Sequence, residues 1–262
     1  DVYKRQVLNR VISKAFKGSA PAQINIPRDM WTQVIDIELP PIIKFERPSG
    51  GSEAIKEAAK LLSNADFPVI LSGAGVVLAD AINDCKALAE KLDSPVASGY
   101  QHNDSFPGSH PLAVGPLGYN GSKAAMELIS KADVVLALGT RLNPFSTLPG
   151  YGIDYWPKDA AIIQVDINSD RIGLTKKVSV GICGDAKQVA QQLLNSLSPE
   201  AGNKNRDERK ALIHQTKSAW LQTLSSMDHE DDDPGTSWNE EARVRDADRM
   251  SPRMAWRAIQ NG

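Results

Sequence analysis

The apolar run Val134–Leu138 constrains the fold more than any other feature of the chain. All of its side chains are apolar, and Gly139, Thr140 and Arg141 follow it directly. A strand that is apolar on both faces is typical of a parallel sheet that helices cover on both sides. Open α/β sheets bind their ligands outside the carboxyl ends of the strands. The run therefore predicts a buried parallel strand that ends, at Gly139 and Arg141, beside a cleft.

Predicted helices and strands alternate on both sides of this run. Apolar runs of strand length are separated by segments with helical spacing, and Ser122 is the predicted N-cap of one such segment. This alternation favours the α/β class with a doubly wound parallel sheet. The predicted strands cover residues 68–72, 95–98, 134–138, 161–166 and 178–182, and the predicted helices cover 52–62, 80–92, 122–130 and 186–197.

Composition divides the chain into a central domain with shorter segments around it. Proline and glycine concentrate in one linker, and charged residues concentrate in another. We expect both ends of the chain to be cuts within a longer protein. The segments are 1–39, the end of a preceding domain with a helix over 7–16 and a strand over 23–26; linker 40–51; domain 52–197; linker 198–250 with a helix over 209–224; and 251–262, the start of another domain.

The composition also excludes several classes of partner. The net charge of −2 leaves no broad basic surface, so we expect neither nucleic acid nor an anionic membrane to bind. No apolar run approaches the ~18–20 residues that span a bilayer. Cys85 and Cys183 lack metal-ligand spacing, and such cysteines are typical of a reducing cytoplasm. We therefore expect a cytoplasmic protein.

Gly73 and Gly75 follow a predicted strand and precede a predicted helix, where a glycine turn can approach a phosphate. A dinucleotide fingerprint has a third glycine, but position 78 is Leu, and no acidic residue ends a strand ~20 residues further on. The pattern favours a tight strand-to-helix turn. A site for a nucleotide or a coenzyme adenosine is the alternative.

The remaining polar candidates gather in predicted loops. We interpret His102, Asp104 and His110 as turn or interdomain residues rather than metal ligands, and we expect the acidic run 230–233 to be solvated. Arg141 could hold a phosphate or sulfonate bidentately, or form an ion pair at a domain interface, and both interpretations stay open. No nucleophile and base are arranged for catalysis, so we assign no catalytic, cofactor-binding or metal-binding residue. The residues expected at a cleft or interface are Gly73, Gly75, His110, Gly139 and Arg141.

Longer stretches resemble one enzyme family. The resemblance covers residues 7–197, and 251–262 is similar to the start of a further domain. The chain resembles thiamine-diphosphate enzymes of the acetolactate synthase type through "INIPRDMW", "FPVILSGAGVV", "LAEKLDSPVAS", "IIQVDIN" and "VGICGDAKQV". Within this type, "HNDSFPGSHP", "GPLGYNGSKAA", "GTRLNPFSTLPGYGIDYWP" and "KKVSVGICGDAK" are most similar to sulfoacetaldehyde acetyltransferases.

The resemblance implies a pyrimidine-binding domain that ends within 1–39, a central domain over 52–197 and a diphosphate-binding domain that begins at 251. It implies a homodimer or homotetramer that uses thiamine diphosphate and Mg²⁺ to convert sulfoacetaldehyde and phosphate to acetyl phosphate and sulfite. The family's activating Glu and metal motif would lie outside this chain, so we expect the chain alone to be inactive. The alternatives are an acetolactate synthase-like carboligase, a 2-oxo acid decarboxylase, and a nucleotide-binding regulatory module.

Two departures from the family's sequence patterns bear on which cofactors we expect this chain to bind. Gly139-Thr140-Arg141-Leu142-Asn143-Pro144 stands where acetolactate synthases usually carry Gly-Ala-Arg-Phe-Asp-Asp, so we do not expect bound FAD. Gly184-Asp185-Ala186 differs from the Gly-Asp-Gly of a magnesium–diphosphate site, and the positions near 212 offer no Asn to complete it. We therefore predict that Asp185 is the N-cap of helix 186–197.

Overall fold

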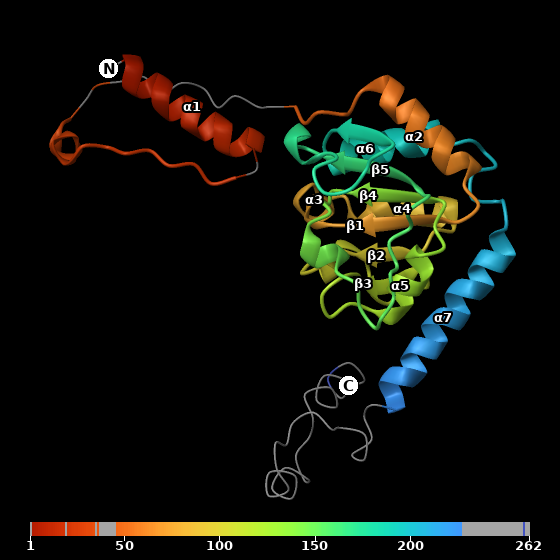
Figure 1. Cartoon of the computed structure of the whole chain (residues 1–262). Coiled ribbons are helices and arrows are strands. Elements are labelled where there is room, and N and C mark those ends of the chain that lie inside the picture. The colour runs from red at the N-terminus through yellow and green to blue at the C-terminus, as the bar shows by residue number, and fades with distance from the viewer. Residues whose placement is uncertain (1, 19, 35, 37–45, 227–258, 260–262) are drawn as a thin grey trace, which may run out of the picture.

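The computed structural model describes residues 2–18, 20–34, 36, 46–226 and 259 of the chain (Figure 1). Within this part, six parallel strands form one sheet in the order β3-β2-β1-β4-β5-β6, which confirms the predicted α/β fold. The strands are β1 (Pro68–Ser72), β2 (Val96–Ser98), β3 (Ala113–Pro116), β4 (Val134–Leu138), β5 (Ala161–Asp166) and β6 (Val180–Cys183).

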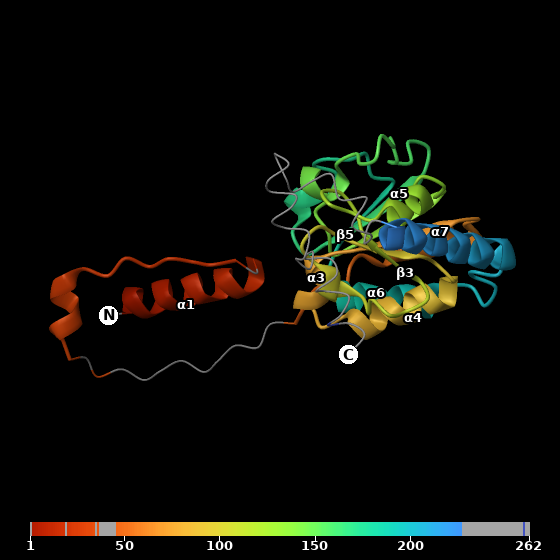
Figure 2. The same ribbon diagram turned by 90° about the horizontal axis from the view of Figure 1, so that it is seen from below.

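Helices cover both faces of this sheet (Figures 1 and 2). On one face α4 (Ile82–Leu92) packs against α6 (Ala186–Ser196), and α2 (Ser52–Asn64) also packs against α6. On the other face α5 (Lys123–Ile129) packs against α7 (Arg206–Ser226). Every residue of β1 and β4 is buried between these layers. Each fully buried Val, Leu or Ile side chain there stabilises the fold by ~1.5–3 kcal/mol.

The strand order reverses between β1 and β4. The chain runs from β1 outward through β2 to β3 and then returns to β4 on the other side of β1. β1 and β4 pair in register from Pro68 opposite Val134 to Ser72 opposite Leu138, so both strands end at the same level. Such a switch point leaves a crevice because the two following turns lead to opposite faces of the sheet.

The predicted elements agree best with the structure where apolar runs are uninterrupted. β1, β4 and β5 have their predicted bounds, and α7 contains the predicted helix 209–224. Ser122 caps α5 as predicted, since its Oγ accepts a hydrogen bond from the Ala125 amide at 3.3 Å. The predicted helix start at 251 lies outside the described residues, apart from Ile259.

Several elements differ from the prediction. Residues 23–26 are not a strand, because no strand of the described chain pairs with them to supply hydrogen bonds. β3 was not predicted, since Gly115 and Pro116 interrupt its pattern; it lies at the edge of the sheet, where proline is tolerated. The short α3 (Ala74–Leu78) precedes α4, so α4 begins at Ile82 rather than at residue 80.

The N-terminal part contains α1 (Val2–Gly18) and a single-turn 3₁₀ helix (Arg28–Thr32). Val7, Leu8, Ile12 and Phe16 on α1 are all exposed. No helix in the described ranges has the length and apolarity needed to cross a bilayer.

Candidate functional site

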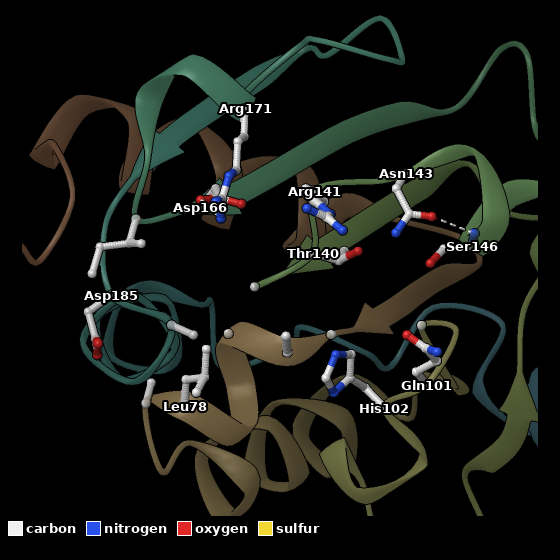
Figure 3. Close-up of a pocket in the computed structure, with 18 of the residues that line it drawn as sticks. Leu78, Gln101, His102, Thr140, Arg141, Asn143, Ser146, Asp166, Arg171 and Asp185 are labelled. Atoms are coloured by element: carbon white, nitrogen blue, oxygen red, sulfur yellow. Dashed lines mark hydrogen bonds and ion pairs between the residues drawn. The ribbon is translucent and has the colours of Figure 1, made fainter. Parts of the chain in front are cut away.

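A crevice with a volume of about 320 Å³ lies at the switch point (Figure 3). Its walls are the turns that follow β1, β4, β5 and β6, together with the loop after β2 and Arg47 from the segment before α2. The structure places four of the five residues expected at a cleft against this crevice: Gly73, Gly75, Gly139 and Arg141. All of them lie within three residues of the end of β1 or β4, and the pairing of these two strands brings the two turns together.

The glycines make a close backbone contact. A Cβ atom on Gly75 would lie 2.6 Å from the Gly139 Cα, and one on Gly73 would lie 2.6 Å from the Thr140 Cβ. Gly139 also has a φ of +63°, a conformation that favours glycine. The amides of Gly73 and Gly75 donate to the carbonyls of Leu138 and Gly139 at 3.1 and 2.8 Å. The geometry therefore favours the tight-turn interpretation, because these amides are not available to a phosphate.

Arginine side chains supply the charge of the crevice. Arg141 is exposed and forms no hydrogen bond or ion pair with the described residues. Arg47 donates from Nη1 to the Asp185 Oδ2 at 2.7 Å, and the Arg171 Nη1 lies 4.0 Å from the Asp166 Oδ1. Three guanidinium groups thus face two carboxylates, and the unpaired charge is that of Arg141.

Figure 3 shows how these groups face one another. Arg141 lies on the same wall as Asp166 and Arg171, across the crevice from Leu78 and His102. The Leu78 side chain is 66% exposed, so it adds an apolar surface opposite the guanidinium. The crevice can therefore hold an anionic group on one wall and an apolar group on the other.

His110 lies away from the crevice. It precedes β3, and the start of a parallel strand lies at the opposite edge of the sheet from the switch-point turns. Its Nε2 is 3.2 Å from the Glu90 Oε1, and its Nδ1 accepts a hydrogen bond from the Leu112 amide. The structure separates it from His102, which lines the crevice. Among the described residues no three His, Cys, Asp or Glu side chains are grouped to hold a metal ion.

Asp185 is the N-cap of α6, as predicted. Its Oδ1 accepts hydrogen bonds from the amides of Lys187 and Gln188 at 3.1 and 3.3 Å, and its Oδ2 pairs with Arg47. A magnesium ion here would have to displace the guanidinium. The described residues around Asp185 therefore do not fit a magnesium–diphosphate group.

The buried Cys85 offers no activated thiolate. Cys85 is fully buried on α4, and burial, with a smaller contribution from Asp84, raises the pKa of its thiol to about 12. The thiol is therefore protonated at neutral pH and unsuited to nucleophilic attack.

Several crevice residues, among them Arg47, Asp166 and Arg171, were not predicted. Asp166 ends β5, so the rule that drew attention to Arg141, a charge at a strand end, also applies to it. The acidic residue was sought ~20 residues after the glycines, where the dinucleotide fingerprint has it. Arg47 lies in the proline- and glycine-rich linker, and no local pattern marks it as part of a site.

Comparisons with known proteins place this fold in a family. The model of the thiamine pyrophosphate enzyme central domain matches residues 55–193. A probable sulfoacetaldehyde acetyltransferase of Rhizobium meliloti is 78% identical over 97% of this chain and 43% of its own length. The sulfoacetaldehyde acetyltransferase of Roseovarius nubinhibens is 74% identical over 97% of this chain and 42% of its own length. A probable acetolactate synthase large subunit of Methanocaldococcus jannaschii is 38% identical over 79% of this chain and 34% of its own length.

A solved structure agrees with the fold. Benzoylformate decarboxylase from Polynucleobacter necessarius superposes with a TM-score of 0.57 at 22% identity, over 69% of this chain and 33% of that one. The chain spans about two fifths of the length of the curated relatives that match it at 74–78% identity. Since the family model covers more than half of the residues, this chain belongs to the thiamine pyrophosphate enzymes and contains their central domain.

Proposed function

We propose that this chain is the central part of a sulfoacetaldehyde acetyltransferase. The observation that carries the proposal is the difference in identity between two groups of relatives. Proteins named for this activity match 89–97% of the chain at 47–78% identity, whereas acetolactate synthase large subunits match 73–79% of it at 31–38% identity. The reaction would convert sulfoacetaldehyde and phosphate to acetyl phosphate and sulfite. The complete protein would be a homodimer or homotetramer in the cytoplasm.

The described residues lack a site for the cofactor, and this determines which part of the complete protein we propose to bind it. Thiamine diphosphate supplies the carbanion chemistry of such enzymes when bound, and the protein supplies orientation and charge. No residue described here fits its magnesium–diphosphate group, so we assign that group to the complete protein outside 52–197. Residues 1–39 would end the pyrimidine-binding domain, and 251–262 would begin the diphosphate-binding domain.

The test uses the protein encoded by the complete reading frame. With thiamine diphosphate and Mg²⁺, we expect sulfite and acetyl phosphate in equal amounts from sulfoacetaldehyde, and only when phosphate is present. Acetolactate formation from pyruvate without sulfite release would overturn the proposal. The 262-residue chain in the same assay should release no sulfite.

A second function, carried by the unpaired Arg141, is the binding of a phosphate-bearing ligand in the crevice. Arg141 would hold the anion through its guanidinium, and Leu78 would pack against an apolar part of the ligand. The glycine amides take no part, because they donate to main-chain carbonyls. We do not expect bound FAD, in keeping with the departure from the acetolactate synthase pattern after β4.

The test is calorimetric titration of the 262-residue chain with ADP and, separately, with inorganic phosphate. A charge-assisted hydrogen bond contributes ~1.5–3 kcal/mol, so Arg141→Gln should weaken ADP binding by ~10- to 100-fold. The matched control is Lys158→Gln, which removes an exposed charge paired with Asp154 outside the crevice. Equal ADP affinity in the wild type and Arg141→Gln, or no binding by the wild type, would overturn this second function.

A further inference from the structure

The segment that leads into α2 is fastened to the turn between β6 and α6. The Asp185 amide donates to the Pro48 carbonyl at 2.8 Å, and Ser49 forms an antiparallel bridge with Gly184. The Gln192 side-chain amide donates to the Ser49 carbonyl at 3.2 Å. Residues 47–51 therefore lie along a turn that is itself a wall of the crevice.

The same seam fits tightly at Gly50. This residue has a φ of +85°, and a Cβ atom on it would lie 2.7 Å from the Ile182 Cγ2. A Cβ atom on Gly184 would in turn lie 3.0 Å from the Gly50 nitrogen. Because the two glycines approach so closely, the segment packs against the domain in one well-defined position rather than through a loose surface contact.

Among the described residues, one ion pair, between Arg47 and Asp185, joins this segment to the crevice. The Asp185 side chain is 3% exposed. Its Oδ1 accepts hydrogen bonds from the first amides of α6, and its Oδ2 pairs with Arg47. The two contacts of the Arg47 guanidinium, with Asp185 and at 3.5 Å with the Leu78 carbonyl, both come from Nη1. Its Nε and Nη2 have no partner among the described residues, and Arg47 lines the crevice.

We propose that the Arg47–Asp185 pair is a latch that couples the position of segment 46–51 to occupancy of the crevice. The coupling rests on the proposed binding of a phosphate-bearing ligand. A guanidinium has donors to spare, so an anion can bind at Nε and Nη2 while Nη1 keeps its contact with Asp185. The ligand then gives Arg47 a second partner and orders the segment. By linkage, fastening the segment raises ligand affinity by the same factor.

The latch itself is tested without ligand, by hydrogen exchange of the 262-residue chain. Arg47→Gln removes the ion pair, and Asp185→Asn weakens it while keeping an oxygen that can cap α6. Both variants should exchange the residue 185 amide, which donates to the Pro48 carbonyl, about threefold faster, with α6 unchanged. Asp185→Ala should speed exchange in both places because the cap is lost as well. Unchanged exchange of the Asp185 amide in Arg47→Gln would overturn the latch.

The coupling is tested by repeating the exchange with saturating ADP. The wild type should gain protection at the residue 185 amide, which donates to the Pro48 carbonyl. Asp185→Asn, which loosens the segment but keeps the guanidinium, should bind ADP about threefold more weakly. Arg47→Gln also removes the anion contact, so it should lose the gain in protection and bind ADP ~10- to 100-fold more weakly. Binding of ADP without any change in the exchange of the Asp185 amide would overturn the coupling and leave the crevice function intact. Failure of the wild type to bind ADP would overturn the crevice function and the coupling together, while the ligand-free comparison would still decide the latch.

Discussion

The buried Arg209 makes the sharpest prediction about stability. It lies near the start of α7, is 1% exposed, and its guanidinium donates to main-chain carbonyls only. Its Nε and Nη2 donate to Asp93 and Leu92 at the end of α4, both at 3.0 Å, and its Nη1 donates to Asp66 at 2.8 Å. Two further bonds go to the carbonyls of residues 202 and 204, just before α7. One side chain therefore joins α7 to the carboxyl end of α4 and the entry to β1.

The groups around the Arg209 guanidinium determine how much stability is lost when this side chain is replaced. Burial lowers the pKa of Arg209, and Asp93 is the largest opposing influence. Asp93 is itself paired with Arg206 and, at 3.3 Å, with Lys210. Arg209→Met leaves five carbonyls without their donor. Each buried acceptor left unsatisfied costs ~1–3 kcal/mol, and because some of the five can turn to water, we expect a total cost of ~3–5 kcal/mol. Arg209→Lys keeps the charge but has three donors for five acceptors. Its free energy of unfolding should therefore lie between those of the wild type and Arg209→Met.

Urea unfolding followed by tryptophan fluorescence measures this cost directly. The free energy of unfolding should fall by ~3–5 kcal/mol in Arg209→Met, and the melting temperature by ~6–20 °C. Arg206→Met is the matched control, because the Arg206 side chain is 45% exposed and such pairs contribute ~1 kcal/mol or less. A loss below ~1 kcal/mol in Arg209→Met would refute the reasoning, since it would mean that the five carbonyls find other donors.

Other predictions concern the crevice turns and the buried thiol. Gly139→Ala should lower the free energy of unfolding by ~1–3 kcal/mol, because φ is +63° and a Cβ atom would lie 2.7 Å from the Gly75 Cα; no change in urea unfolding would contradict this. Ser122→Ala should cost ~1 kcal/mol by the same measurement, through loss of the α5 cap. A thiol reagent should label the exposed Cys183 and leave Cys85 unlabelled until the chain unfolds. Because the pKa of Cys85 is raised to about 12 from 9.0, the unfolded thiol ionises first, so the free energy of unfolding should decrease above pH 9.0, and less steeply in Cys85→Ala.

The sequence predicted the fold well where one local pattern decides the structure. Buried central strands such as β4 are apolar at every position, and their bounds followed from that pattern alone. β3 was missed because its glycine and proline are acceptable only at a sheet edge, and edge position is a property of the assembled sheet. The expected strand at 23–26 failed for a related reason, since a strand needs a neighbour that no local pattern supplies.

The candidate site was predictable only in part. Gly139 and Arg141 were found because the carboxyl ends of parallel strands meet at one edge. His110 was grouped with them by its chemistry, but it precedes its strand and therefore lies at the other edge. The contact of Arg47 with Asp185 joins residues 138 positions apart, which no local pattern reveals. Main-chain carbonyls accept hydrogen bonds from the glycine amides, and this too could not be predicted, because it depends on how the two turns lie side by side in the folded chain.

The proposed function is tested most directly by the products that the complete protein forms from sulfoacetaldehyde. We predict that sulfite and acetyl phosphate appear together at equal rates, that both depend on added phosphate and thiamine diphosphate, and that pyruvate yields no acetolactate. Acetolactate as the product, with no phosphate-dependent sulfite release, would contradict the proposed function.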